Sequence, residues 1–219
     1  MGQSSILNEK QKLILEIFRT DKKLSPIFYF TGGTALSEYY LKHRESIDLD
    51  FFTKSDFDSQ IVLEAVNSWS NKLDFTIHSN FVDPTYIYLL KFKDGDELKI
   101  DFAKYPYPQL NQPENHDGLI VDSFFDISVN KFLTINQRTE VKDFVDLYYI
   151  LEKFIFWQLK DGVMTKFNIE IDPFLMAADY TKVESFQNLP KMLKHLDLKT
   201  LKEFFKEKAR KLSSEIIKQ

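Results

Sequence analysis

The sequence predicts an α+β protein in which a mixed sheet with flanking helices is followed by a helical C-terminal region. Stretches with the alternating polarity of β-strands lie in the first half of the chain. The pattern then changes, because residues 121–156 are apolar at helical spacing and contain neither proline nor glycine. We therefore expect an α/β core over residues 1–120 and a helical domain over residues 121–219.

Individual elements follow from the same patterns. A helix is expected over residues 7–18, a strand over residues 27–31, and a second helix over residues 34–41, directly after a glycine pair. The other expected elements are strands over residues 46–52, 75–81, 86–92 and 97–103, a hairpin turn at 94–96, a loop over 105–118, and helices over 57–73, 173–178 and 189–217. Breaks in the long helical stretch are expected at residues 137–139, where Thr139 could cap the next helix, and near residues 160–162.

Composition narrows the class of protein. The 219 residues are 43% hydrophobic, which allows a sizeable core, and the net charge of −4 argues against general binding to nucleic acid by phosphate attraction. There is no cysteine, so disulfides and thiolate metal sites are excluded, and no stretch of ~18 apolar residues predicts a membrane span. We expect a cytoplasmic protein that does not enter a membrane. The chain from Lys191 onward is basic, with nine Lys and Arg residues against four Asp and Glu. This excess of positive charge could guide RNA, or it could form the solvent-exposed face of an amphipathic helix.

Asp48 and Asp50 are the strongest candidates for a metal site. They alternate with Ile47, Leu49 and Phe51, so on a strand both carboxylates project from the face opposite the apolar side chains. Neighbouring carboxylates repel each other, and a hard divalent cation such as Mg²⁺ removes that repulsion and prefers oxygen ligands. Alternatively, the two aspartates could form the solvent face of an edge strand.

Asp101 is the candidate for a third metal-binding carboxylate. It lies on the polar face of a second alternating stretch, together with Lys99. Nucleotidyl transfer uses divalent cations to bridge a triphosphate and align an attacking hydroxyl, and Asp101 could also act as the general base for that hydroxyl. The alternative is a surface residue beside Lys99.

The turn formed by Gly32, Gly33 and Thr34 is suited to binding phosphate. Glycines allow a close approach of the backbone, and the N-terminus of the following helix offers N–H groups. Thr34 could hydrogen-bond a phosphate oxygen or cap its own helix. Followed closely by Asp48 and Asp50 on another strand, this turn indicates phosphate chemistry more strongly than a glycine pair alone.

The combination of these motifs resembles the AbiEii/AbiGii group of nucleotidyltransferase toxins, within the DNA-polymerase-β-like superfamily. The similarity covers residues 28 to 205, roughly, and includes four motifs in the family's order. They are Gly32-Gly33-Thr34-Ala35-Leu36 with His43-Arg44 and Ser46 to Phe52, then Lys99-Ile100-Asp101, then Asp126 to Lys131, and lastly Arg138 with Lys142 to Tyr148. The resemblance implies a nucleotidyltransferase-fold mixed sheet.

The resemblance also implies a function and a set of roles. The chain would be the toxin of a toxin–antitoxin or phage-defence system, with a separate antitoxin protein as partner. It would transfer a nucleotide from an NTP with Mg²⁺ or Mn²⁺, and RNA, in particular the 3′ end of tRNA, is the leading acceptor. Asp48 and Asp50 would hold metal and Lys131 would contact the triphosphate. Asp143 or Asp146 would orient the triphosphate or serve the chemistry.

The residues themselves leave some of these roles open. Lys131, Arg138 and Lys142 are spaced to share one face of a continuous helix and could receive a triphosphate, although the expected break at Thr139 weakens this geometry. Asp143 and Asp146 could instead hold these cations in position. Arg44 could contact phosphate, or it could form a salt bridge that fixes its loop, for example to Asp48 or Asp50.

Two other functions fit the same residues. The chain could be a nucleotidyltransferase or phosphotransferase that acts on a protein or a small molecule, which the acidic net charge favours slightly. It could also be a catalytically inactive module that only binds nucleotide. The presence of Asp48, Asp50 and Asp101 argues against the inactive module.

Overall fold

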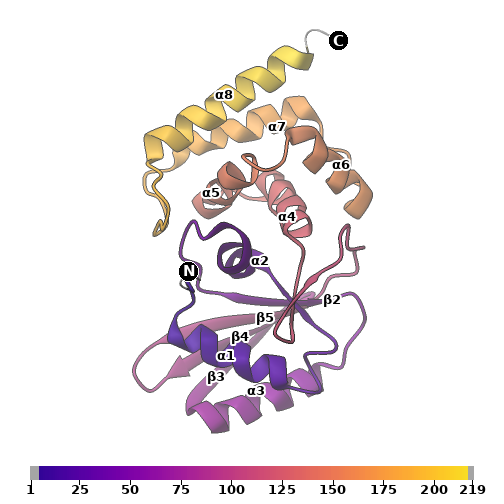
Figure 1. Ribbon diagram of the computed structural model, residues 1–219, viewed down its shortest axis with the longest axis vertical. Helices are drawn as coiled ribbons and strands as arrows, with labels where there is room; N and C mark the ends of the chain where they lie inside the picture. The colour runs from indigo at the N-terminus through magenta and orange to yellow at the C-terminus, as the bar shows by residue number, and fades with distance from the viewer. Residues whose placement is uncertain (1–4, 217–219) are drawn as a thin grey trace. The chain divides into compact units, whose positions relative to one another are not determined.

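The computed structural model describes residues 5–216, which form two compact units (Figure 1). Within the described residues, the first unit comprises residues 5–40, 46–108 and 112–123, and the second comprises residues 41–45, 109–111 and 124–216. The main boundary therefore follows residue 123. Two short segments that the sequence assigned to the α/β core, 41–45 and 109–111, belong to the second unit.

The first unit is built on a seven-stranded sheet with the order β3-β4-β5-β2-β1-β7-β6. Strand β2 runs parallel to β5 and β1 runs parallel to β7, while the other neighbours are antiparallel, so the sheet is mixed as predicted. The strands are β1 (Tyr29–Thr31), β2 (Leu49–Thr53), β3 (Phe75–Val82), β4 (Thr85–Phe92), β5 (Glu97–Lys104), β6 (Glu114–His116) and β7 (Leu119–Val121).

Two helices of this unit, α1 (Glu9–Thr20) and α3 (Ser59–Leu73), cover one face of the sheet. Phe18 of α1 stacks on Phe51 of β2 with ring centroids 4.0 Å apart, and Phe51 stacks on Phe102 of β5. Trp69 of α3 contacts Phe102 as well. Because side chains alternate along a strand, Asp50 and Asp101 project from the opposite face of the same two strands.

Three details of this unit differ from the sequence predictions. The expected loop over 105–118 contains β6, which pairs with β7 in a hairpin. The second helix begins earlier than expected, as α2 (Gly32–Ala35), and continues as a π-helix, η1 (Leu36–Leu41). Ile47 is 61% exposed because β2 begins only at Leu49, so its side chain lies outside the alternation that buries Leu49 and Phe51.

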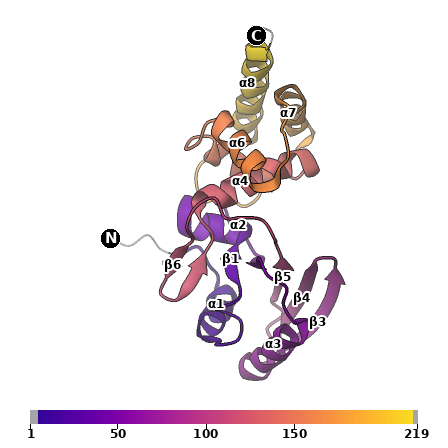
Figure 2. The same cartoon turned by 90° about the vertical axis from the view of Figure 1, so that its right-hand side faces the viewer.

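The second unit is helical, as predicted, and Figures 1 and 2 show α7 and α8 packed side by side. The predicted break at residues 137–139 is confirmed, but the residue before α5 is Glu140 and no side chain caps that helix, so the Thr139 cap is wrong. The helices are α4 (Phe124–Gln137), α5 (Val141–Ile150), α6 (Phe156–Phe167), α7 (Pro173–Tyr180), η2 (Thr181–Ser185) and α8 (Leu198–Ile216).

Two predicted helix boundaries in this unit are wrong for identifiable reasons. Helix α6 continues through Gly162, where a Cβ would lie 2.5 Å from Cγ2 of Val129, so this glycine serves helix packing rather than termination. Residues 189–197 are not helical, because their backbone bonds residues 43–45: the carbonyl of Lys191 accepts from the N–H of Glu45, and the N–H of Leu193 donates to the carbonyl of His43. Residue 217, the expected end of α8, lies outside the described residues. None of the described helices is both long and apolar enough to cross a membrane.

Candidate active site

An acidic cluster lies on the face of the first unit's sheet that is opposite Phe51 and Phe102. Asp50 of β2 and Asp101 of β5 are register partners on adjacent parallel strands, and such strands lie about 4.8 Å apart. Asp48 immediately precedes β2. All three side chains are half-buried. The structure thus brings together the three carboxylates that the sequence singled out.

Lys99 is the cationic member of this cluster. Its ammonium lies 2.6 Å from Oδ2 of Asp101 and 3.8 Å from Oδ2 of Asp48. Burial lowers the pKa of Lys99, but the hydrogen bond to Asp101 and the charges of Asp101, Asp48 and Asp50 outweigh it, and the net pKa is raised. Lys99 therefore remains protonated and supplies positive charge where the carboxylates repel each other.

Asp101 retains unused hydrogen-bonding capacity. Its Oδ1 is buried and has no hydrogen-bond partner among the described residues, and a buried oxygen without a partner is costly. Burial raises the pKa of Asp101, Lys99 lowers it, and Asp48 raises it again, so that the net pKa lies above the ordinary value for an aspartate. Asp101 is thus suited to accept a cation or a proton at Oδ1.

The carboxylates of this cluster are the type of ligand that a divalent cation prefers, but they are not already arranged around a metal position. Among residues 5–216 no group of three or more acidic or histidine side chains is already gathered in a geometry that would hold a metal ion. Yet the cluster offers only oxygen ligands, which Mg²⁺ and Mn²⁺ prefer, and one of them is the unpartnered Oδ1 of Asp101. The ammonium of Lys99 now supplies the positive charge that a bound metal ion would otherwise supply.

The residues before β2 support this cluster directly. Gly32 has φ +76°, and a Cβ placed on it would lie 1.9 Å from Oδ2 of Asp50, so the glycine makes room for that carboxylate. The buried hydroxyl of Thr34 donates a hydrogen bond to the backbone carbonyl of Asp48 at 2.5 Å. Thr34 is therefore not the cap of α2, whose N-cap position is Thr31 and lacks a side-chain bond.

Replacing Gly32 by alanine is expected to reduce activity and stability together, because the new methyl group would displace Asp50. The matched control is Gly95→Ala, since Gly95 also has positive φ (+91°) but nothing lies within 4 Å of its Cβ position. Backbone strain alone costs about 1–2 kcal/mol at each site. Chemical denaturation and transfer assays on both variants should show an activity loss only for Gly32→Ala. Equal behaviour of the two variants would contradict this role for Gly32.

A second charged cluster, within the second unit, surrounds Asp146 of α5, which is completely buried. Nε and Nη2 of Arg44 donate to its two oxygens at 2.6 and 2.8 Å, and Nε2 of His43 lies 2.7 Å from Oδ1. The ammonium of Lys131 is 2.7 Å from Oδ2. Burial raises the pKa of Asp146, but Arg44, Lys131 and His43 outweigh it and hold that pKa well below the ordinary value.

Asp143, one turn earlier on α5, extends this cluster. It accepts from Lys131 at 2.9 Å and from Nε of Arg138 at 2.7 Å, and it too is fully buried. Burial lowers the pKa of Lys131, but Asp146 and Asp143 raise it by more. The two aspartates thus hold the cationic side chains in position, which is the second of the roles that the sequence left open for them.

The structure separates the residues of the predicted phosphate-binding face. Lys142 pairs with Glu140 at 3.0 Å and is not part of the cluster, because the break between α4 and α5 interrupts the single face on which it was expected with Lys131 and Arg138. Arg44 does form a salt bridge that fixes its loop, and its partner within the second unit is Asp146.

Two residues in these clusters, Lys99 and His43, had no specific role predicted from the sequence. Lys99 shares a strand face with Asp101 at a spacing of two, and this alternation was the available signal for its ion pair. His43 contacts Asp146 from 103 residues away, and no local pattern indicates that contact. Burial lowers the pKa of His43 by more than its bond to Asp146 raises it, so the imidazole is neutral at pH 7.

Comparison with solved structures gives the class of fold. The chain is similar to JHP933 from Helicobacter pylori, with a TM-score of 0.59 and 22% identity over 97% of this chain and 96% of that one. It is also similar to MenT4, the nucleotidyltransferase toxin Rv2826c from Mycobacterium tuberculosis H37Rv, with a TM-score of 0.53 and 17% identity over 85% and 75% of the two chains. The protein therefore has the nucleotidyltransferase fold, as predicted.

The sequence then gives the family. Residues 14–211 match the family described as nucleotidyl transferase AbiEii toxin, type IV TA system, and this chain belongs to that family. An uncharacterized protein from Aquifex aeolicus (strain VF5) is 38% identical over 138 residues, which are 61% of this chain. The match spans 62% of the length of that relative.

Proposed function

We propose that this protein transfers a nucleoside monophosphate from an NTP to an acceptor hydroxyl, with its acidic cluster as the catalytic centre. The observation that carries the proposal is the pairing of Asp50 and Asp101 on adjacent parallel strands, with Asp48 beside them and Oδ1 of Asp101 unpartnered. Asp48, Asp50 and Asp101 would hold Mg²⁺ or Mn²⁺, which when bound offsets charge on the triphosphate and aligns the reacting groups.

The proposed reaction forms one bond to phosphorus, breaks another and transfers one proton to a side chain of this protein. The acceptor hydroxyl oxygen forms a bond to the α-phosphorus of the NTP, the bond from that phosphorus to the bridging oxygen breaks, and pyrophosphate leaves. We assign the hydroxyl proton to the carboxylate of Asp101, which the sequence also indicated as the general base. Asp48 and Asp50 serve as ligands.

We assign phosphate binding to cationic residues of the helical unit. Lys131 and Arg138 are the assigned phosphate ligands, and Gly32 and Gly33 would admit the nucleotide close to the backbone. Asp143, Asp146 and Arg44 act as positioning residues, because their charges are engaged with one another and with Lys131. Lys142, which pairs with Glu140, and Thr34, which bonds the carbonyl of Asp48, support neighbouring structure.

Family membership supports the biological setting that we propose. The chain would act in the cytoplasm as the toxin of a toxin–antitoxin system, with the antitoxin as a separate protein and RNA, in particular the 3′ end of tRNA, as the acceptor. Purified protein with Mg²⁺ and total RNA should transfer label from [α-³²P]NTP but not from [γ-³²P]NTP to RNA. Transfer of the γ label would replace nucleotidyl transfer by kinase chemistry. Absence of any transfer with all four NTPs, to RNA, protein or small molecules, would refute the proposal.

Lys99→Met is expected to tighten binding of a divalent cation, because the variant removes the cation that now neutralises Asp101 and Asp48. An increase in affinity of about tenfold is expected for Mn²⁺, measured by isothermal titration calorimetry. Lys104→Met is a matched control, since both side chains are on β5 and 37% exposed, but Lys104 pairs with Asp56. Weaker binding by Lys99→Met, or equal effects of both substitutions, would contradict this competition.

A further inference from the structure

The helical unit contains a pocket that the proposed function does not use. It has a volume of about 260 Å³ and lies where the α5–α6 connection meets α7 and α8. Its walls are mainly apolar, and the exposed Ile155 and Trp157 are 62% and 39% accessible. The lining residues are Leu151, Ile155, Phe156, Trp157, Tyr180, Lys208, Lys211 and Leu212.

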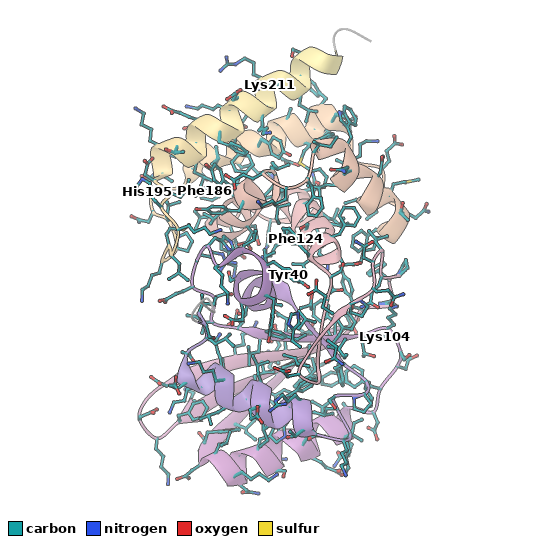
Figure 3. All side chains as sticks on the ribbon, in the orientation of Figure 1. Tyr40, Lys104, Phe124, Phe186, His195 and Lys211 are labelled. Atoms are coloured by element: carbon teal, nitrogen blue, oxygen red, sulfur yellow. The ribbon has the colours of Figure 1, made fainter. Side chains whose placement is uncertain are left out.

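Positive charge accompanies this apolar surface. Lys208 and Lys211 both line the pocket from α8, and Figure 3 labels Lys211 on that helix. Lys211 pairs with Glu207, but Lys208 has no ion pair within the part of the chain that the structure describes, and its ammonium lies 5.1 Å from the ring centroid of Phe204. A cation on an apolar wall without an acidic partner favours a ligand that brings one negative charge.

Tyr180 of α7 forms part of the pocket wall. Its side chain lines the pocket and is 1% exposed, and its hydroxyl has no hydrogen-bond partner among residues 5–214. Burial strongly raises the pKa of this hydroxyl, so the group is a neutral donor. The hydroxyl itself is inaccessible from the pocket, so Tyr180 contributes its apolar ring to the pocket wall.

We propose that this pocket binds a small carboxylic acid with an apolar body about the size of one ring. A volume of about 260 Å³ lies just below the roughly 300–1,000 Å³ of pockets for drug-sized ligands, which matches a compact ligand. The apolar body packs between Phe156, Trp157 and Leu212, and the carboxylate lies at Lys208. The acid is a free small molecule, and the site is separate from the chemistry assigned to Asp50 and Asp101.

The experiment uses the full-length protein and phenylacetate, with the neutral phenylacetamide as its isostere. The chain has two tryptophans, so their indole N–H resonances in a ¹H–¹⁵N spectrum report on two places. Trp157 lines the pocket, whereas Trp69 is buried in the first unit and donates to Asp21. Phenylacetate should shift the Trp157 resonance saturably, with a dissociation constant of about 1 mM or tighter, and leave Trp69 unmoved.

The carboxylate contact is tested by substitution on α8. Lys208→Gln should weaken phenylacetate binding about tenfold, as expected for loss of a charged hydrogen bond, and phenylacetamide should bind the wild-type protein about tenfold more weakly. Lys199→Gln is the control, because Lys199 is exposed on the same helix and pairs only loosely with Glu203. No saturable shift of Trp157, equal binding of the amide, or equal effects of the two substitutions would overturn the proposal.

Discussion

Asp50→Asn is expected to reduce nucleotidyl transfer by roughly a hundred- to a thousandfold, while the protein stays folded. The substitution preserves the shape that fits beneath Gly32 but removes one negative charge from the pair with Asp101. The cluster would then hold a divalent cation poorly and leave the triphosphate charge uncompensated. The rate of pyrophosphate release at saturating NTP and Mg²⁺ measures the effect.

Asp96→Asn is the control for this experiment. Asp96 is exposed in the turn between β4 and β5, so it shares the hairpin with Asp101 but not the cluster. The rate of pyrophosphate release by Asp96→Asn should remain within about twofold of wild type, since surface substitutions have small effects. A rate for Asp50→Asn that matches the control would show that the chemistry does not depend on this carboxylate.

Asp146→Ala is expected to cause the largest loss of stability among single substitutions in the charged clusters. It would leave Arg44 and Lys131 buried without their shared counter-charge, and breaking such a pair costs roughly 3–5 kcal/mol. For a chain of this size the melting temperature should fall by about 6–20 °C. Urea denaturation of the variant at pH 7 measures the change in the free energy of unfolding.

The pH dependence gives a second test of Asp146. Its pKa is held well below the ordinary value by Arg44 and Lys131, against the effect of burial. Its contribution to stability is therefore complete above the unfolded pKa, near 3.8, and is lost as the pH falls through the folded pKa. The wild type should lose more stability than Asp146→Ala between pH 5 and strong acid. Asp161→Asn, at an exposed position on α6, should lose as much stability as the wild type over this pH range. If Asp146→Ala and Asp161→Asn lost the same amount of stability, a special role for Asp146 would be contradicted.

Local patterns were sufficient to predict the acidic cluster and most of the sheet. Alternation along β5 buries Leu98, Ile100 and Phe102 and leaves Asp101 on the other face, as expected. The pairing of β2 with β5 is not local and was not predicted, although the expected metal site required Asp101 to lie near Asp48 and Asp50. The exposed Ile47 shows the limit of this reasoning, because alternation does not reveal at which residue a strand begins.

Contacts between distant segments could not be predicted in the same way. Arg44 binds Asp146 across 102 residues, and Asp126 forms a buried ion pair with Lys166 at 2.7 Å. Each of these residues also fits the pattern of a solvated helix or loop, so only the fold reveals that their charges are enclosed. The three-residue strand β6 was missed because its sequence is polar and follows a proline-containing stretch.

The most direct test of the proposed metal site is a crystal structure with Mn²⁺ and a non-hydrolysable NTP analogue. We expect an anomalous difference peak coordinated by carboxylate oxygens of Asp48, Asp50 and Asp101, with the ammonium of Lys99 moved away from Oδ2 of Asp101. Bound nucleotide with the manganese peak elsewhere, or with Lys99 still 2.6 Å from Asp101 and no metal between the carboxylates, would contradict it.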